Sequence, residues 1–262
     1  MDTQTIEELV DLKGKAAVVT GGARGIGQCI ALALAQSGAA VMIADSNLEA
    51  AYRTVQDIKE RGGYAEAMLA DACSAEDARR LAQQTVERLG ALDILVNTSA
   101  TFSFSPVLPT VQGLWSKVLS SHVKGVYYYC DAAAREMLEA RRGGRIVNIA
   151  SLEAMKPPSE PVSREVTESS VAIISKALAI EYGPHGINVN ALAPGAVRTP
   201  AIQRQAAGLS NTMRGSRDDL SANSPLPLDD DSLEGAEEIV TAVLFLVSEA
   251  GESVTGNLIV VE

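Results

Sequence analysis

The stretch TGGARGIG, residues 20–27, decides how the rest of the chain is interpreted. It follows a short apolar run, KAAVVT, which predicts a buried strand, and it opens a longer amphipathic run that predicts a helix. Three of its glycines permit a tight turn and a close approach of the backbone to a ligand, namely Gly21, Gly25 and Gly27. The start of the helix also offers free N–H groups and a partial positive charge, so the stretch predicts a phosphate-binding loop.

Short apolar runs alternate with amphipathic runs on the C-terminal side of this loop. Further strands are expected at residues 39–45, 64–71, 92–97, 144–151, 187–195 and 257–262. Helices are expected at residues 25–38, 48–63, 75–90, 166–183 and 236–248, and within 111–140. We therefore predict an α/β fold, a single doubly wound, Rossmann-like domain over residues 1–262 with a mostly parallel sheet. The irregular stretch at about 195–232 is interpreted as a lid-like loop or, alternatively, as an acidic surface loop.

The bulk composition excludes several classes of protein. The chain has 262 residues, of which 47% are hydrophobic, so it is long enough to bury a full core. A formal net charge of −11 without basic clusters argues against a nucleic-acid partner. No run approaches the length of about 18 apolar residues that a membrane span needs. Three widely spaced cysteines and two histidines predict neither a disulfide framework nor a metal site, which fits a cytoplasmic protein.

The second predicted strand ends in an acidic residue, Asp45, which bears on the choice of nucleotide. Strand, glycine loop, helix, second strand and terminal acid follow one another in the order of a dinucleotide-binding unit. A carboxylate at this position can accept hydrogen bonds from a ribose diol and would repel a 2′-phosphate, which favours NAD over NADP. Arg24 weakens that preference slightly, because it lies near the phosphates. The alternative is an inherited nucleotide loop that binds nothing.

The same residues carry a family resemblance. The motifs TGGARGIG, DILVN, GRIVNIAS, ALAIEYGPHGINVNALAPG and VTGNLIVVE resemble the classical short-chain dehydrogenase/reductase family over about residues 12–262. The resemblance implies one Rossmann-like domain, bound NAD and a dimer or tetramer. It also places the cofactor against residues of the glycine loop and of the strand ends: Gly21, Arg24, Gly25, Ile26, Gly27, Asp45, Asp71, Ala72, Asn97, Pro194, Gly195 and Val197.

The resemblance further implies a proton-relay tetrad of Asn, Ser, Tyr and Lys, and this chain departs from it. The family Ser is present as Ser151, but the Asn position holds His122. The Tyr position holds Arg164 and the Lys position holds Glu168. The family motif N-N-A-G after the fourth strand is altered as well, to NTSA at residues 97–100.

The altered tetrad changes the chemistry that the cleft can perform. In the family, the tyrosine exchanges the alcohol proton and the lysine lowers the pKa of that tyrosine. Arg164 cannot relay protons near neutral pH, because the ordinary pKa of a guanidinium exceeds about 12. Losing a general acid–base typically lowers a rate by about 10²–10⁴-fold. Arg164 and Glu168 can simply form an ion pair one helical turn apart. Alternatively, all four tetrad positions line one cleft, in which His122 and Glu168 act as a new acid–base pair and Arg164 holds an anionic substrate.

These departures predict a chain without dehydrogenase chemistry of its own. The leading hypothesis is a structural or regulatory subunit of an NAD-dependent alcohol or hydroxyacyl-CoA dehydrogenase, assembled as a homo- or hetero-oligomer, such as a tetramer, with an active paralogue. This is similar to the dehydrogenase of the anaerobic toluene (benzylsuccinate) pathway that oxidises a hydroxybenzylsuccinyl-CoA and pairs an intact with a degenerate short-chain subunit, which would imply aromatic degradation. The alternatives are a non-redox cyclase or isomerase in a repurposed cleft, and an active NAD-dependent oxidoreductase with atypical residues.

Overall fold

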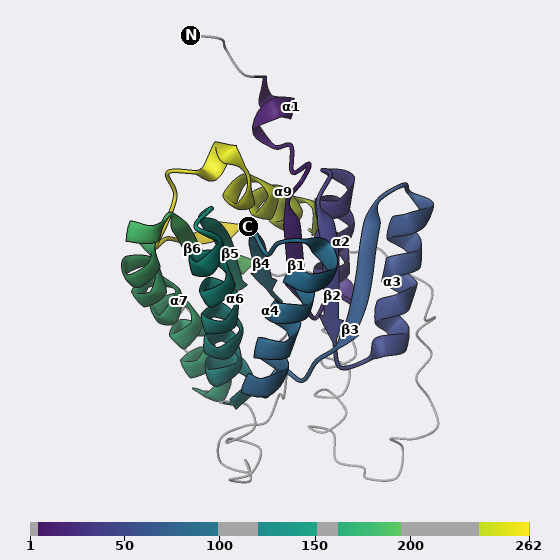
Figure 1. The fold of residues 1–262 in the computed structure, drawn as a ribbon. Coiled ribbons are helices and arrows are strands. Elements are labelled where there is room, and N and C mark those ends of the chain that lie inside the picture. Colours follow the sequence, from purple (N-terminus) through teal and green to yellow (C-terminus); the bar gives the residue numbers. More distant parts are fainter. Residues whose placement is uncertain (1–4, 99–119, 151–161, 195–235, 262) are drawn as a thin grey trace, which may run out of the picture.

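The computed structural model describes residues 5–98, 120–150, 162–194 and 236–261 (Figure 1). At residues 6, 7, 120–122 and 162–169 it describes the backbone and not the side chains. The expected lid-like loop at about 195–232 lies outside the described residues. A short helix near the N-terminus, α1 (Ile6–Leu9), was not predicted from the sequence and projects away from the sheet (Figure 1).

The described strands form one seven-stranded sheet in the order β3-β2-β1-β4-β5-β6-β7. Every neighbouring pair is parallel. The strands are β1 (Ala16–Thr20), β2 (Ala40–Asp45), β3 (Tyr64–Leu69), β4 (Ile94–Asn97), β5 (Gly144–Ile149), β6 (Ile187–Pro194) and β7 (Leu258–Val261). The predicted parallel α/β class is therefore confirmed, and the sheet order is that of a doubly wound fold.

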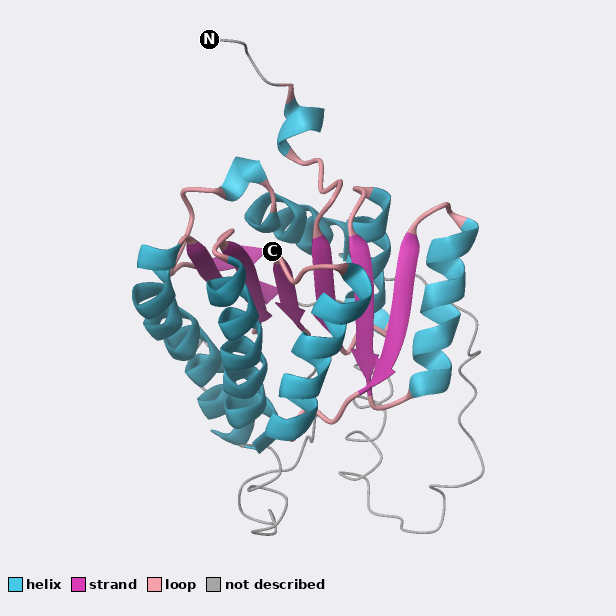
Figure 2. Cartoon of the chain, in the orientation of Figure 1, coloured by secondary structure: helices cyan, strands magenta, loops and turns pink. Residues whose placement is uncertain are grey.

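Helices cover both faces of this sheet, as Figure 2 shows. The main helices are α2 (Gly25–Gln36), α3 (Leu48–Glu60), α4 (Ala75–Leu89), α6 (Val126–Ala140), α7 (Val162–Tyr182) and α9 (Ala236–Val247). Shorter turns are η1 (Ser120–Gly125), η3 (Gly183–His185) and η4 (Glu249–Gly251). Buried side chains of α2, α3 and α9 share one core cluster, and those of α4, α6 and α7 share the other.

The side chains of β1 alternate between the two clusters. Ala17 and Val19 pack with the α2, α3 and α9 side, whereas Val18 packs with the α4, α6 and α7 side. All five residues of the strand are buried. A parallel strand that is covered on both faces is mostly apolar, which explains the continuous hydrophobic run AAVV at residues 16–19.

The direction of the sheet order reverses at β1. The chain adds β2 and β3 on one side of β1 and then returns to add β4 on the other side. Thr20, the last residue of β1, has Ala44 of β2 and Asn97 of β4 as its register partners. A crevice outside the carboxyl ends of strands at such a reversal is the usual ligand site of open α/β sheets.

Several element boundaries differ from the predicted ones, among them the end of β3 and the start of α7. Strand β3 ends at Leu69, two residues before the predicted end at Asp71, because the backbone turns there: the Cys73 N–H donates to Asp71 Oδ1 and the Ser74 N–H donates to the Asp71 carbonyl. Helix α7 begins at Val162, before the predicted start at residue 166.

Candidate functional site

The glycine loop between β1 and α2 adopts a backbone that requires glycine. Gly21 and Gly25 have φ values of +66° and +62°, in the left-handed region. The Gly21 N–H donates to the carbonyl of Ala44 at 2.7 Å, which ties the loop to β2. A Cβ at Gly25 would meet no atom within 4 Å, so the loop is open on that side. A Cβ at Gly27 would instead overlap the Gly21 carbonyl oxygen and Thr98 Oγ1, so the helix start packs tightly against the loop.

The first turn of α2 lacks a capping side chain among the described residues. Arg24, at the N-cap, is extended and makes no side-chain hydrogen bond to the turn. The first N–H groups of an α-helix have no partner within the helix. Because α2 starts after the glycine loop that follows β1, these N–H groups and the positive end of the helix dipole lie at the carboxyl end of the sheet. This arrangement fits a pyrophosphate, which is the group that the sequence predicts here.

The carboxylate of Asp45 holds the loop in place. Its Oδ2 accepts from the Ala23 N–H at 3.2 Å and its Oδ1 accepts from the Asn47 N–H at 2.9 Å. Sequence reasoning assigned this residue only to a ribose diol and missed the role in shaping the loop. A carboxylate offers about four acceptor sites, so these two bonds leave room for a diol as well.

Asn97, a predicted cofactor contact, directs its side chain into the core. It is 4% exposed, and its Nδ2 donates to Asn148 Oδ1 at 2.8 Å. Asn148 Nδ2 donates in turn to Ser175 Oγ at 2.9 Å, and Ser175 Oγ donates to the carbonyl of Val171 at 2.7 Å. The side chain of Asn97 therefore ties β4 to β5 and α7.

The buried network also includes a thiol. Cys130 Sγ lies 3.4 Å from Asn148 Oδ1 and 3.5 Å from Asn97 Nδ2. Burial raises the pKa of Cys130 to about 12, so the group stays a neutral thiol and can donate to Asn148. A buried polar network with satisfied members makes a core rigid.

The loop after β3 carries Asp71 and Ala72, two further predicted contacts. The Asp71 N–H donates to Asp77 Oδ2 at 2.9 Å, and its carbonyl accepts from the hydroxyl of Tyr129 at 2.9 Å. Burial, and then the nearby Asp77 and Asp71 carboxylates, raise the pKa of Tyr129, so its hydroxyl stays a donor. Of the three consecutive tyrosines at residues 127–129, only Tyr129 is buried, because the helix directs this position toward the core.

The positions of the tetrad are carried by three different parts of the fold. His122 lies in η1, a π-helical turn that leads into α6. Arg164 and Glu168 lie one turn apart near the start of α7, and their side chains, like that of His122, are outside the described atoms. Ser151 follows β5 and lies outside the described residues. The backbones of η1 and α7 contact one another, which brings three of these positions to neighbouring elements.

Two of the remaining predicted cofactor residues lie on described elements. Ile26 is in the first turn of α2, and Pro194 is the last residue of β6. Gly195 and Val197 lie outside the described residues.

Comparison with known proteins identifies the family. A family model described as Enoyl-(Acyl carrier protein) reductase matches residues 21–262. The short chain dehydrogenase/reductase astE of Aspergillus oryzae is 32% identical, over 98% of this chain and 96% of that protein. The chain belongs to the short-chain dehydrogenase/reductase family. L-rhamnose 1-dehydrogenase (NAD(P)(+)) of Azotobacter vinelandii is 29% identical over 95% of both chains.

The fold of this family member agrees with solved structures. A short-chain type dehydrogenase/reductase from Mycobacterium marinum superposes with a TM-score of 0.83 at 28% identity, and 98% of this chain and 97% of that chain are covered. By descent, the chain is thus an oxidoreductase of this family. The glycine loop and the uncapped start of α2 fit the NAD(P) that the family typically binds. In the described ranges, no helix is long and apolar enough to cross a membrane.

Proposed function

We propose that this chain is an NAD-binding subunit of a short-chain dehydrogenase assembly in which an active paralogue performs the chemistry. The observation that carries the proposal is the pair Arg164 and Glu168, on the first turns of α7, where the family has tyrosine and lysine. A guanidinium does not exchange protons near neutral pH, and a carboxylate does not stabilise a phenolate.

The nucleotide end of the crevice supports cofactor binding by this chain. The backbone N–H groups at the start of α2 would hold the pyrophosphate, and Asp45 would hold the adenosine ribose. NAD, when bound, supplies the acceptor or donor of hydride. The carboxylate of Asp45 favours NAD over NADP because it repels a 2′-phosphate.

An apolar stripe on α7 supports assembly with another subunit. Ile173 is 70% exposed and Ile180 is 73% exposed, and their spacing of seven residues places them on one face of the helix. Tyr127, on neighbouring α6, is 47% exposed. Large apolar side chains that recur on one helix face are typical of a protein contact. We infer that α6 and α7 pack against a second short-chain subunit, in a dimer or tetramer.

One observation favours a second candidate function. His122 lies in a π-helical turn, and such turns frequently occur at functional sites. Because η1 contacts α7, His122 could act with Glu168 as an acid–base pair in a repurposed cleft. This candidate is a non-redox catalyst such as an isomerase or cyclase.

The two candidate functions differ in which subunit supplies the residues that perform the chemistry: the active paralogue in the first, and this chain in the second. The chain purified alone should show no appreciable NAD-linked oxidation of a panel of secondary alcohols and hydroxyacyl-CoA esters, measured by NADH absorbance. Co-expressed with a paralogue that has an intact Y-x-x-x-K, the assembly should be active, and activity should depend on the tyrosine of the paralogue.

Substitutions in this chain provide the decisive comparison. Arg164→Ala, Glu168→Ala and Ser151→Ala should each leave turnover by the intact assembly within about twofold of the unsubstituted complex, because an acid–base role would require a loss of about 10²-fold or more. Glu87→Gln, at an exposed position of α4, serves as the matched control. Loss of turnover with the assembly intact by gel filtration would reject the inactive-subunit proposal in favour of the repurposed cleft.

A further inference from the structure

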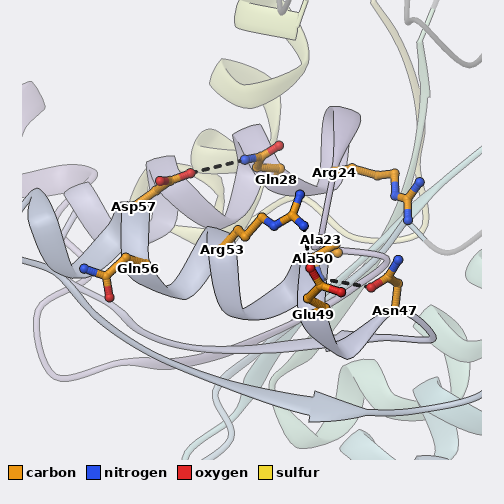
Figure 3. Close-up of a pocket in the computed structure, with 9 residues that line it drawn as sticks. All are labelled: Ala23, Arg24, Gln28, Asn47, Glu49, Ala50, Arg53, Gln56 and Asp57. Atoms are coloured by element: carbon orange, nitrogen blue, oxygen red, sulfur yellow. Dashed lines mark hydrogen bonds and ion pairs between the residues drawn. The ribbon is translucent and has the colours of Figure 1, made fainter. Parts of the chain in front are cut away.

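A cavity of about 630 Å³ lies between the start of α2 and the outer face of α3 (Figure 3). Its lining includes Ala23 and Arg24 from the glycine loop, and Asn47, Glu49 and Arg53 from the start of α3. The cavity adjoins the predicted pyrophosphate site through Arg24, the N-cap of α2, and none of its lining residues is a tetrad position.

The cavity adjoins Asp45 through two shared residues. Ala23 and Asn47 both line it, and these two residues donate their backbone N–H groups to the Asp45 carboxylate at 3.2 and 2.9 Å. The Asp45 carboxylate is therefore hydrogen-bonded to two residues of the cavity wall. If Asp45 holds the adenosine ribose, a substituent on the ribose 2′-oxygen would meet this wall.

The charged groups of the cavity include two guanidiniums, Arg24 and Arg53. Two guanidiniums would attract a phosphate, because each presents several N–H donors in a planar fork. Arg24 takes part in none of the ion pairs between described residues. Arg53 Nη2, by contrast, lies 2.5 Å from Glu49 Oε1, and Figure 3 shows the two side chains directed toward one another.

We propose that Glu49 is a second determinant of cofactor choice, which acts with Asp45 to exclude a nucleotide 2′-phosphate from this cavity. Glu49 places a negative charge beside the phosphate position and engages the Arg53 guanidinium that would otherwise bind the phosphate. The inference rests on the proposed binding of NAD. It predicts that Asp45 and Glu49 both contribute to discrimination against NADP. It also predicts that the Glu49 carboxylate can be removed without loss of NAD affinity.

A competing explanation is that Glu49 only stabilises α3. It lies in the first turn of that helix, where a negative charge interacts favourably with the helix dipole. That role would change the stability of the chain but would affect NAD and NADP equally. The ratio of the two affinities therefore separates the explanations.

The experiment is calorimetric titration of the full chain with NAD and with NADP, repeated with ADP and 2′,5′-ADP as probes of the adenosine end. Glu49→Gln should strengthen binding of NADP and 2′,5′-ADP by about tenfold, as expected for one repulsive charge at a partly screened site, and should change NAD and ADP by less than about twofold. Adding Arg53→Gln to Glu49→Gln should reverse most of that gain, since Arg53 is the group that Glu49 neutralises. Raising the salt concentration should reduce the difference in NADP affinity between Glu49→Gln and the unsubstituted chain.

Asp57→Asn is the matched control, because this carboxylate also lines the cavity but accepts from Gln28 Nε2 at 3.5 Å. It should change the ratio of NADP to NAD affinity much less than Glu49→Gln does. An unchanged ratio in Glu49→Gln, with NAD binding intact, would overturn the role of Glu49 alone. Failure of every variant to bind either dinucleotide would overturn the proposed cofactor and this inference together.

Discussion

Helix α2 begins after β1 and helix α3 begins after β2, and the two helices differ in how their first turns are capped. At α3, Asn47 Oδ1 accepts from the Ala50 N–H at 3.0 Å, and at α4 Ser74 Oγ accepts from the Asp77 N–H at 3.1 Å. At α2, Arg24 occupies the N-cap and no described side chain caps the turn. A missing cap lowers stability by about 1 kcal/mol. The first turns of α3 and α4 are therefore capped by their own side chains, whereas the first turn of α2 is left open, as the proposed binding of a pyrophosphate requires.

The substitution with the largest expected effect on the start of α2 is Gly27→Ala. Its Cβ would overlap the Gly21 carbonyl oxygen and Thr98 Oγ1, so the start of α2 must move away from the loop. We expect a loss of about 1–3 kcal/mol in the free energy of unfolding, typical of overpacking, and loss of measurable NAD binding. Urea unfolding and calorimetric titration measure the two effects.

Gly62→Ala is the control for Gly27→Ala. Gly62, unlike Gly27, has a positive φ, +82°, and a Cβ there would meet no atom within 4 Å, so its substitution strains the backbone without overpacking. It should cost about 1–2 kcal/mol through backbone strain and leave NAD affinity unchanged. Equal NAD affinity in the two variants would contradict the packing role given to Gly27.

Asn47→Ala tests the capped side of the comparison. We expect a loss of about 1 kcal/mol in the free energy of unfolding, because Ala50 loses its acceptor. NAD affinity should fall by less than about threefold, since the Asn47 backbone N–H that holds Asp45 is retained in alanine. A large loss of NAD affinity at unchanged stability would show that the side chain, rather than the backbone, serves the nucleotide.

The smallest and sharpest test is Arg24→Ser, which gives α2 the cap that it lacks. The serine hydroxyl can accept from an N–H of the first turn and should stabilise the free chain by about 0.5–1 kcal/mol. The same hydroxyl would then compete with the pyrophosphate, and we expect NAD affinity to fall several-fold. Thermal unfolding with and without NAD measures both, and a variant that gains stability and keeps its affinity would show that α2 is not a ligand site.

Local sequence patterns predicted the features that are local in the structure. Apolar runs identified each strand of the sheet, because the residues of one strand are consecutive in sequence. The glycine loop was recognised for the same reason, since strand, turn and helix follow directly in sequence. These patterns need no knowledge of which strands are neighbours.

Contacts between distant segments could not be predicted in this way. The hydroxyl of Tyr129 meets the carbonyl of Asp71, 58 residues away, and Asn97 meets Asn148, 51 residues away. Both contacts depend on the sheet order and on the face that a helix presents, neither of which is encoded in a short window. The side chain of Asn97 ties core strands together, and the cofactor contact that the family resemblance implies for this residue stays a prediction.

The amide pair of Asn97 and Asn148 also has a consequence for how the sheet assembles. These residues are direct register partners on β4 and β5. Strand β4 contributes only the run ILVN, and its three apolar residues would pack comparably if the strand were shifted along its neighbour. A shift would separate the two amides and leave buried donors and acceptors without partners, at about 1–3 kcal/mol for each. The amide pair thus selects one alignment of the central strands, and it penalises misaligned sheets during folding before any ligand is present.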